Sequence, residues 1–200
     1  LVRRFQSALP YPLTTAQHRA IAEIEGDLAS PHPMHRLLQG DVGSGKTVVA
    51  VSALLVAVQG GHQGALMAPT EVLAEQHFYG LRDLLAELTV PDDSTLMGER
   101  PLRLELLTNR TTGAERIRLL AGLADGTVDL VVGTHALIQD QVGFGSLGVV
   151  VIDEQHRFGV EQRAALRDAG QGDRVPDVLV MTATPIPRTA AMTVYGDLDV

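Results

Sequence analysis

The segment Gly40–Thr47 has the residue types and spacing of a phosphate-binding loop, G-x-x-x-x-G-K-T. Its glycines allow the backbone to wrap so tightly that N–H groups converge on phosphate oxygens, and the N-terminus of a following helix adds favourable partial charge. In such loops the lysine reaches the β- and γ-phosphates of a nucleotide, and the last hydroxyl binds Mg²⁺. We therefore expect nucleotide contacts from Gly40, Gly43, Ser44, Gly45, Lys46, Thr47 and Val48.

Lys46 is the single lysine among 16 basic residues, and all the others are arginines. Lysine ends in a compact ammonium, whereas arginine ends in a planar fork of donors. An ammonium fits between two phosphates where a guanidinium would be too large. The alternative is a glycine-rich turn that carries a lysine by chance, but an apolar strand pattern precedes the loop and a helical pattern follows it, which favours phosphate binding.

A second chemical pattern is the acidic pair Asp153–Glu154, which ends the apolar run VVVI. Ligands of parallel sheets bind at the carboxyl ends of the strands, so both side chains are expected to face the phosphates. Asp153 is the candidate Mg²⁺ ligand together with Thr47, and Glu154 is the candidate base that polarises an attacking water. An acidic pair after a strand is usually only a turn, but after a phosphate-binding loop it indicates nucleotide hydrolysis by Lys46, Asp153 and Glu154.

The elements that must position these residues alternate between short apolar runs and longer helical patterns, which predicts an α/β fold with a doubly wound, mostly parallel sheet. We read 89–101 as a mobile surface loop because it is polar and rich in turn residues. The expected strands are Met34–Gln39, Gly64–Thr70, Leu102–Thr108, Val128–Thr134, Leu147–Glu154 and Asp177–Thr184, and the expected helices are Lys46–Val58, Glu71–Leu88, Gly113–Ala124 and Val160–Asp168.

The composition sets limits on the class of protein. A chain of 200 residues with 45% hydrophobic content suits one domain, 1–200, and no apolar run is long enough to span a bilayer. The absence of cysteine excludes disulfides and thiolate metal sites and fits a cytoplasmic protein. A net charge of −8 argues against a basic protein that coats nucleic acid. Because the chain starts at Leu1, we expect it to be a fragment of a longer protein.

Several nucleotide enzymes are disfavoured by missing motifs. A GTPase needs an Asn-Lys-x-Asp motif, which cannot exist here because Lys46 is already used. No LSGGQ transporter signature is present. A small-molecule kinase stays open, although a glutamate beside the metal-binding aspartate favours the activation of water.

Five motifs together resemble the DExH helicases of superfamily 2, and DEQHRFGVEQRAAL resembles RecG-type branched-DNA helicases in particular. Mfd-like transcription-repair coupling translocases are the nearest alternative, and Gln155 is the discriminating residue because the Mfd box usually reads Asp-Glu-Glu-His. A catalytically silent binding module is a third reading, disfavoured by the intact phosphate-binding and acidic residues. The motifs are LTTAQ (Leu13–Gln17), APTEVLAEQH (Ala68–His77), GTHALIQ (Gly133–Gln139), DEQH (Asp153–His156) and TATPIPRT (Thr182–Thr189).

This resemblance implies a RecA-like motor domain that binds Mg·ATP, within an ATP-dependent DNA helicase that remodels stalled forks and Holliday junctions in recombination and repair. It implies two partners in the same protein: a wedge domain before Leu1 and a second RecA-like domain after Val200 that carries an arginine finger. Such a finger contributes about 10³–10⁵ in rate. The isolated domain is therefore expected to bind ATP but to hydrolyse it poorly.

The resemblance also assigns roles to residues outside the phosphate-binding loop. Gln17 would read the adenine edge, or else be a surface glutamine on a helix. DNA contacts would come from Pro69, Thr70, Thr134 and His135, with Thr70 as an ordinary helix N-cap in the alternative reading. Thr182 and Thr184 would couple the nucleotide to the DNA, or form a polar turn. His156 would link the hydrolytic site to the same motif, or be only a hydrogen-bonding partner. The histidines without metal-ligand spacing, expected to be solvated or capping, are His18, His32, His35, His62 and His77.

The chain departs from the RecG-type pattern at two places. It has LTNRTTG at Leu107–Gly113, where a shorter LTG is usual, and this changes an expected DNA-contact segment. The insertion at 89–101 is also longer than usual.

Overall fold

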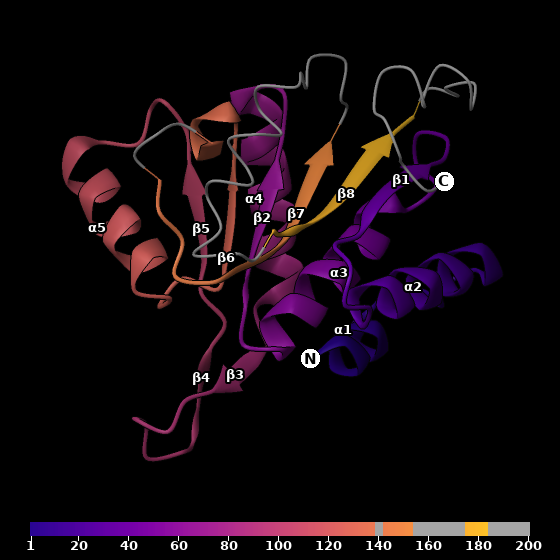
Figure 1. Ribbon diagram of the computed structural model, residues 1–200, viewed down its shortest axis with the longest axis horizontal. Coiled ribbons are helices and arrows are strands. Elements are labelled where there is room, and N and C mark those ends of the chain that lie inside the picture. The colour runs from indigo at the N-terminus through magenta and orange to yellow at the C-terminus, as the bar shows by residue number, and fades with distance from the viewer. Residues whose placement is uncertain (139–141, 154–174, 184–200) are drawn as a thin grey trace.

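A six-stranded, entirely parallel sheet forms the centre of the computed structural model, which describes residues 1–138, 142–153 and 175–183 (Figure 1). The strand order is β1-β8-β7-β2-β6-β5. The edge strands are therefore β1 and β5, and the last two strands, β7 and β8, lie between β1 and β2. The predicted α/β fold with a parallel sheet is confirmed. The strands are β1 (His35–Gln39), β2 (Gln63–Met67), β5 (Leu104–Leu107), β6 (Leu130–Gly133), β7 (Leu147–Asp153) and β8 (Asp177–Thr182).

The central strands are buried on both faces, which explains their continuous apolar sequences. Every residue of β2 and β6 is buried. Along β7, Val149 and Val151 pack into one core, and Val150 and Ile152 pack into the other. Alternation along this strand therefore separates the two cores on the two sides of the sheet.

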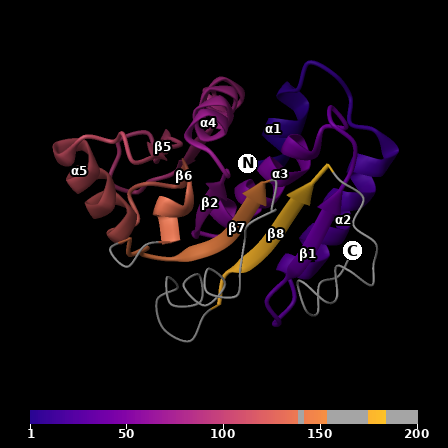
Figure 2. The ribbon, with the colours of Figure 1, turned by 90° about the horizontal axis from the view of Figure 1, so that it is seen from above.

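Helices cover both faces of the sheet, as a doubly wound fold requires (Figure 2). Those on one face share a core with α3, whose sequence is apolar around most of its circumference. On the other face α5 packs through Leu119 and Leu123. The described helices are α1 (Val2–Ala8), α2 (Thr15–Leu28), α3 (Lys46–Gln59), α4 (Glu71–Leu85), α5 (Gly113–Ala124) and the 3₁₀ turn η1 (His135–Ile138).

Most element bounds agree with the predictions to within a few residues. The helix α5 has the predicted ends, and α4 stops at Leu85 rather than Leu88. The strand β1 ends at Gln39 as predicted, whereas β2, β5, β6 and β8 end one to three residues earlier than predicted. Neither α1 nor α2 was predicted. The predicted helix Val160–Asp168 lies outside the described residues.

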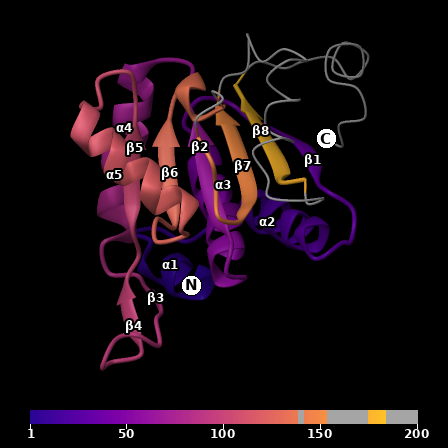
Figure 3. The same cartoon turned by 60° about the vertical axis from the view of Figure 1, so that its left-hand side comes forward.

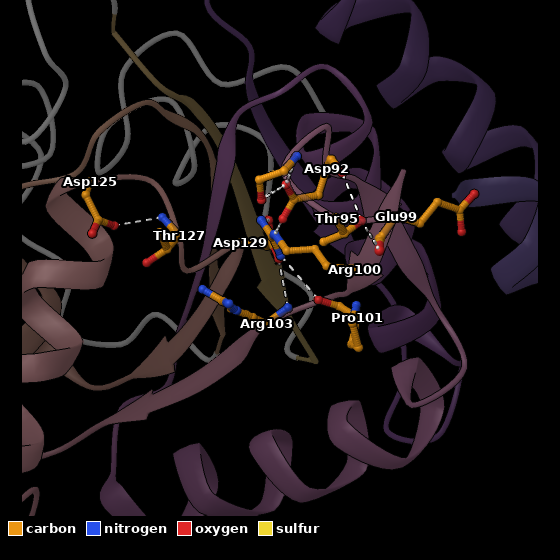
Figure 4. Close-up of polar contacts among 10 residues, drawn as sticks. Asp92, Thr95, Glu99, Arg100, Pro101, Arg103, Asp125, Thr127 and Asp129 are labelled. Atoms are coloured by element: carbon orange, nitrogen blue, oxygen red, sulfur yellow. Dashed lines mark hydrogen bonds and ion pairs between the residues drawn. The ribbon is translucent and has the colours of Figure 1, made fainter. Parts of the chain in front are cut away.

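The segment 89–101 was predicted to be a mobile surface loop, but its two ends pair as the antiparallel strands β3 (Thr89–Pro91) and β4 (Glu99–Pro101). The hairpin projects from the end of the molecule opposite the carboxyl ends of the parallel strands (Figures 1 and 3). At its base the Arg100 guanidinium donates hydrogen bonds of 2.6 and 2.9 Å to the Asp129 carboxylate (Figure 4). This ion pair with a distant residue orders a segment whose own sequence resembles a flexible loop.

The carboxylate of Asp177, at the start of β8, provides a test of how burial affects stability. It accepts a hydrogen bond of 2.5 Å from the Met34 backbone N–H, yet burial raises its pKa above 3.8, with a smaller contribution from Asp27. The folded state therefore binds this proton more tightly than the unfolded state, so the ionised group costs stability at neutral pH and the cost disappears as the pH falls below 3.8.

Replacement of Asp177 by asparagine is expected to raise the melting temperature at pH 7, because the amide oxygen still accepts from Met34 and carries no charge. The advantage over the wild type should shrink as the pH is lowered toward 3.8, where the wild-type carboxyl is itself neutral. Thermal melts across this pH range measure the difference. An advantage that is independent of pH would contradict this explanation.

Candidate functional site

The phosphate-binding loop joins the end of β1 to the start of α3, as its sequence predicted. Gly43 and Gly45 adopt φ values of 80° and 78°, in the left-handed region that favours glycine. A Cβ atom at Gly45 would also collide with the side-chain nitrogen of Gln17. A side chain at this position would be strained by the backbone conformation and would force the Gln17 side chain to move.

The Lys46 side chain folds over the loop from the first turn of α3. Its Nζ atom donates hydrogen bonds of 2.7 Å to the Gly40 carbonyl and 2.8 Å to the Asp41 carbonyl. The ammonium is therefore held at the loop, beside the backbone N–H groups that begin the helix. This orientation fits the phosphate-binding role expected of the lysine.

Gln17 lies against the same loop. Its side chain completes a capping box with Thr14 at the start of α2, and its Nε2 donates a hydrogen bond of 3.0 Å to the Ser44 carbonyl. The residue is only 9% exposed, so the reading as a surface glutamine was wrong. A cleft of about 480 Å³ lies beside it, bordered by Gln17, Gly40, Ser44 and Lys46. Adenine recognition by Gln17 stays a prediction.

Asp153 ends β7 at the same edge of the sheet as the phosphate-binding loop. The strand β8 separates β7 from β1, and its residues Met181 and Thr182 are in register with Asp153 and Gln39. Since neighbouring strands lie about 4.8 Å apart, Asp153 is about 10 Å across the sheet from β1. A magnesium-bound triphosphate can bridge this separation, so the two positions are compatible with one nucleotide.

The loop is also tied to β8 directly. The Gly40 N–H donates a hydrogen bond of 3.2 Å to the Thr182 carbonyl, and Thr182 is 4% exposed. This backbone contact brings the start of the motif TATPIPRT against the phosphate-binding loop. The predicted catalytic and coupling residues Glu154, His156 and Thr184 lie outside the described residues.

One residue at this edge was misread from the sequence. His77, expected to be solvated or to cap a helix, places its Nε2 2.6 Å from Oδ2 of Asp153. The signal was present in the sequence: His77 stands at i+3 from Ala74 and i−4 from Leu81, which are both buried on α4. A polar side chain on a buried helix face needs a hydrogen-bonding partner.

The described residues contain no group of three or more histidine, cysteine, aspartate or glutamate side chains that could hold a metal ion. A site built entirely from protein ligands, of the zinc or calcium type, is therefore not found in that part of the chain. The Thr47 hydroxyl in the first turn of α3 and the Asp153 carboxylate are both oxygen donors. Such a donor set fits Mg²⁺, which binds few protein ligands and completes its shell with water and phosphate oxygens.

The DNA-contact candidates follow two neighbouring strands, since Met67 pairs with Gly133. Pro69 and Thr70 are exposed, and the Thr70 hydroxyl accepts a hydrogen bond of 3.3 Å from the Leu73 N–H, which confirms that Thr70 is a helix N-cap. His135 is also exposed.

The burial of Thr134 disagrees with its predicted contact with DNA. It is only 2% exposed, and its carbonyl accepts a hydrogen bond of 3.0 Å from the Leu137 N–H in η1. The described structure therefore gives Thr134 a structural role in holding η1, because a buried side chain cannot reach a bound strand.

Arg110 is a further residue at this edge that was not singled out from the sequence. It belongs to the LTNRTTG segment, and its side chain is 71% exposed. The guanidinium lies 3.0 Å from the Glu71 carboxylate and 3.5 Å from that of Glu75, both on α4. The departure from the shorter LTG pattern thus places a cation beside the first turn of α4.

No helix among the described residues combines the length and apolar character needed to cross a membrane.

Comparison with known proteins gives concordant matches over nearly the whole chain. It is 55% identical over 197 residues to the ATP-dependent DNA helicase RecG of Bacillus subtilis, covering 98% of this chain and 27% of that protein. It is 52% identical to the RecG of Mycobacterium tuberculosis (strain H37Rv), covering 96% of this chain and 26% of that protein. The chain thus spans about a quarter of the length of the curated relatives it matches.

Solved structures agree on the fold. A structure of RecG bound to a three-way DNA junction matches with a TM-score of 0.80 and 43% identity, covering 98% of this chain and 24% of that one. The helicase MrfA matches with a TM-score of 0.69 at 17% identity, over 97% of this chain and 31% of that one, which shows the shared fold alone. The DEAD/DEAH box helicase family matches residues 14–193. The chain, with its RecA-like α/β fold, therefore belongs to the DEAD/DEAH box helicase family.

Proposed function

We propose that this chain is the ATP-binding motor domain of a DNA helicase that remodels branched DNA, such as stalled forks and Holliday junctions, in recombination and repair. The observation that carries the proposal is that Lys46 and Asp153 both lie at the carboxyl ends of the parallel strands. The chain is also 55% identical to a protein named ATP-dependent DNA helicase RecG. The choice of branched DNA as the substrate is supported by the similarity to the structure of RecG bound to a three-way DNA junction.

The nucleotide site would work mainly by positioning and by electrostatic stabilisation. The backbone N–H groups from Gly43 to Val48 and the Lys46 ammonium would hold the phosphates, while Gln17 would meet the adenine. Thr47 and Asp153 would hold Mg²⁺, which when bound neutralises charge on the phosphates. Glu154 would orient and deprotonate the attacking water.

DNA would lie across the exposed positions Pro69, Thr70 and His135. Their hydroxyl, imidazole and backbone groups suit phosphate and sugar contacts, which hold a strand without reading its bases. Thr182 would couple the two ligands through its carbonyl contact with Gly40, which is 3.2 Å long. His156 and Thr184 would take part in the same coupling.

The complete protein would supply a second RecA-like domain with an arginine finger and a wedge domain that recognises the fork. This fits the coverage of only 27% of the Bacillus subtilis relative. We propose a cytoplasmic location because ATP and DNA are both available there. An Mfd-like duplex translocase is the alternative from the sequence, but the relatives described above carry the name RecG and no structural observation favours Mfd.

The isolated domain is expected to bind Mg·ATP but to turn it over about 10³–10⁵-fold more slowly than the complete motor on DNA, because the arginine finger is missing. Fluorescent ATP binding and phosphate release measure the two properties. Three-way junctions should stimulate the ATPase of the complete protein more than linear duplex of equal length. Rapid turnover by the isolated domain, or equal stimulation by both DNAs, would contradict the proposal.

A further inference from the structure

His77 and Asp153 form a contact that the proposed nucleotide chemistry does not by itself require. The His77 Nε2 lies 2.6 Å from the Asp153 Oδ2, and the two side chains are only 15% and 14% exposed. An ionised carboxylate can only accept hydrogen bonds, so Nε2 must carry the hydrogen and donate it. The hydrogen bond therefore commits Oδ2 and fixes the direction in which Oδ1 points.

The two residues come from elements that are not neighbours in the sheet. Asp153 ends β7, whereas His77 belongs to α4, which packs on β5 and β6. The strand β2 lies between β7 and β6. The contact therefore crosses the carboxyl end of β2 and joins the nucleotide edge to α4.

Two of the DNA-contact candidates, Pro69 and Thr70, lie at the N-terminus of α4. Its N-cap is Thr70, whose hydroxyl accepts from the Leu73 N–H, and His77 lies two turns further along the same helix. Ala74 and Leu81, on either side of His77, are 0% and 1% exposed, so this part of α4 is packed tightly. The hydrogen bond from His77 therefore joins Asp153 to the same packed helix whose N-cap is Thr70.

We propose that His77 is a positioning residue that holds the Asp153 carboxylate in the orientation needed for Mg²⁺, and that it links α4 to the metal site. The inference rests on the proposed function, because it concerns the Mg²⁺ expected at Asp153. Groups that hydrogen-bond a metal ligand fix its orientation, and their loss typically weakens metal affinity about 10–100-fold. The effect of losing His77 should therefore appear in metal binding before it appears in folding.

The test is a Mg²⁺ titration of fluorescent ATP binding to the complete protein, with a parallel measurement in EDTA. Replacement of His77 by alanine should raise the Mg²⁺ concentration for half-maximal binding about 10–100-fold while nucleotide affinity in EDTA is unchanged. His77→Gln should restore most of the Mg²⁺ affinity, since its Nε2 also donates. The matched control is His32→Ala. It removes an exposed imidazole that precedes β1, at the amino end of this strand and not at the carboxyl end where the nucleotide would bind.

A normal Mg²⁺ titration for His77→Ala would overturn the inference. So would equal defects in the alanine and glutamine variants, because they would point to helix packing rather than to the hydrogen bond. Should the alanine variant fail to fold, His77→Asn replaces it: the shorter amide should lose the contact and show the Mg²⁺ defect that His77→Gln does not. Wild-type protein that binds no Mg·ATP would instead refute the proposed function.

Discussion

Replacement of Lys46 by alanine in the complete protein is expected to abolish DNA-stimulated ATP hydrolysis. The ammonium is the only lysine cation of the chain, and it is held at the phosphate-binding loop by the Gly40 and Asp41 carbonyls at 2.7 and 2.8 Å. Removing one donor that stabilises charge in the transition state typically costs about 10²–10³ in rate. The fold should survive, because the hydrogen bonds of the lysine within the described residues are to two loop carbonyls.

Two further variants make this expectation specific. Lys46→Arg should also be severely impaired, because a planar guanidinium cannot occupy the space between two phosphates as an ammonium does. Arg118→Ala removes an exposed positive charge from α5 and should leave ATP hydrolysis unchanged. Steady-state ATPase rates with and without branched DNA, together with circular dichroism, measure these effects. Wild-type activity in Lys46→Ala would refute the assigned role.

The largest expected effect on stability comes from Asp129. Its carboxylate is 8% exposed and accepts three hydrogen bonds: two from the Arg100 guanidinium and one of 2.7 Å from the Arg103 N–H. The same contact raises the pKa of Arg100, because the carboxylate stabilises the charged guanidinium. Asp129→Ala leaves a largely buried cation without its main acceptor, which typically costs about 3–5 kcal/mol.

Asp92 reduces the expected loss of stability, because its carboxylate lies 3.4 Å from the Arg100 guanidinium and remains as a partner. We expect the lower half of that range, which corresponds to a fall in melting temperature of about 10 °C for a domain of this size. The control is Asp83→Ala, which breaks an exposed ion pair with Arg82 and should cost less than about 1 kcal/mol.

A double variant separates the ion pair from general packing. Arg100→Met combined with Asp129→Leu replaces both charges with apolar groups and should be more stable than Asp129→Ala alone, because no buried charge is left unpaired. Urea and thermal unfolding of the three variants provide the comparison. An unchanged melting temperature for Asp129→Ala would show that the hairpin base does not depend on this pair.

Where the deciding interactions are close in sequence, the predictions were accurate. The helix α5 begins and ends where predicted because its start carries its own capping box, formed by Thr112 and Glu115. The phosphate-binding loop was recognised because strand, glycines, lysine and helix all fall within about twenty consecutive residues. The buried strands were recognised because a sheet covered on both faces demands unbroken apolar runs.

Two of the errors share one physical origin. The hairpin at 89–101 depends on the pair of Arg100 and Asp129, and the contact of Asp153 depends on His77. In each case a polar residue reads from its neighbours as solvated or flexible, and its partner arrives from another element. Local propensity has no information about such partners.

The amino-acid sequence by itself determined the parallel α/β architecture, the loop that cradles phosphates and the edge of the sheet at which the chemistry lies, because periodicity and glycine spacing act over a single turn or strand. Only the tertiary structure decided which polar side chains meet. It brought His77 to Asp153, Gln17 to Ser44 and Arg100 to Asp129, because hydrogen bonds and ion pairs require contact distances that chain folding alone sets.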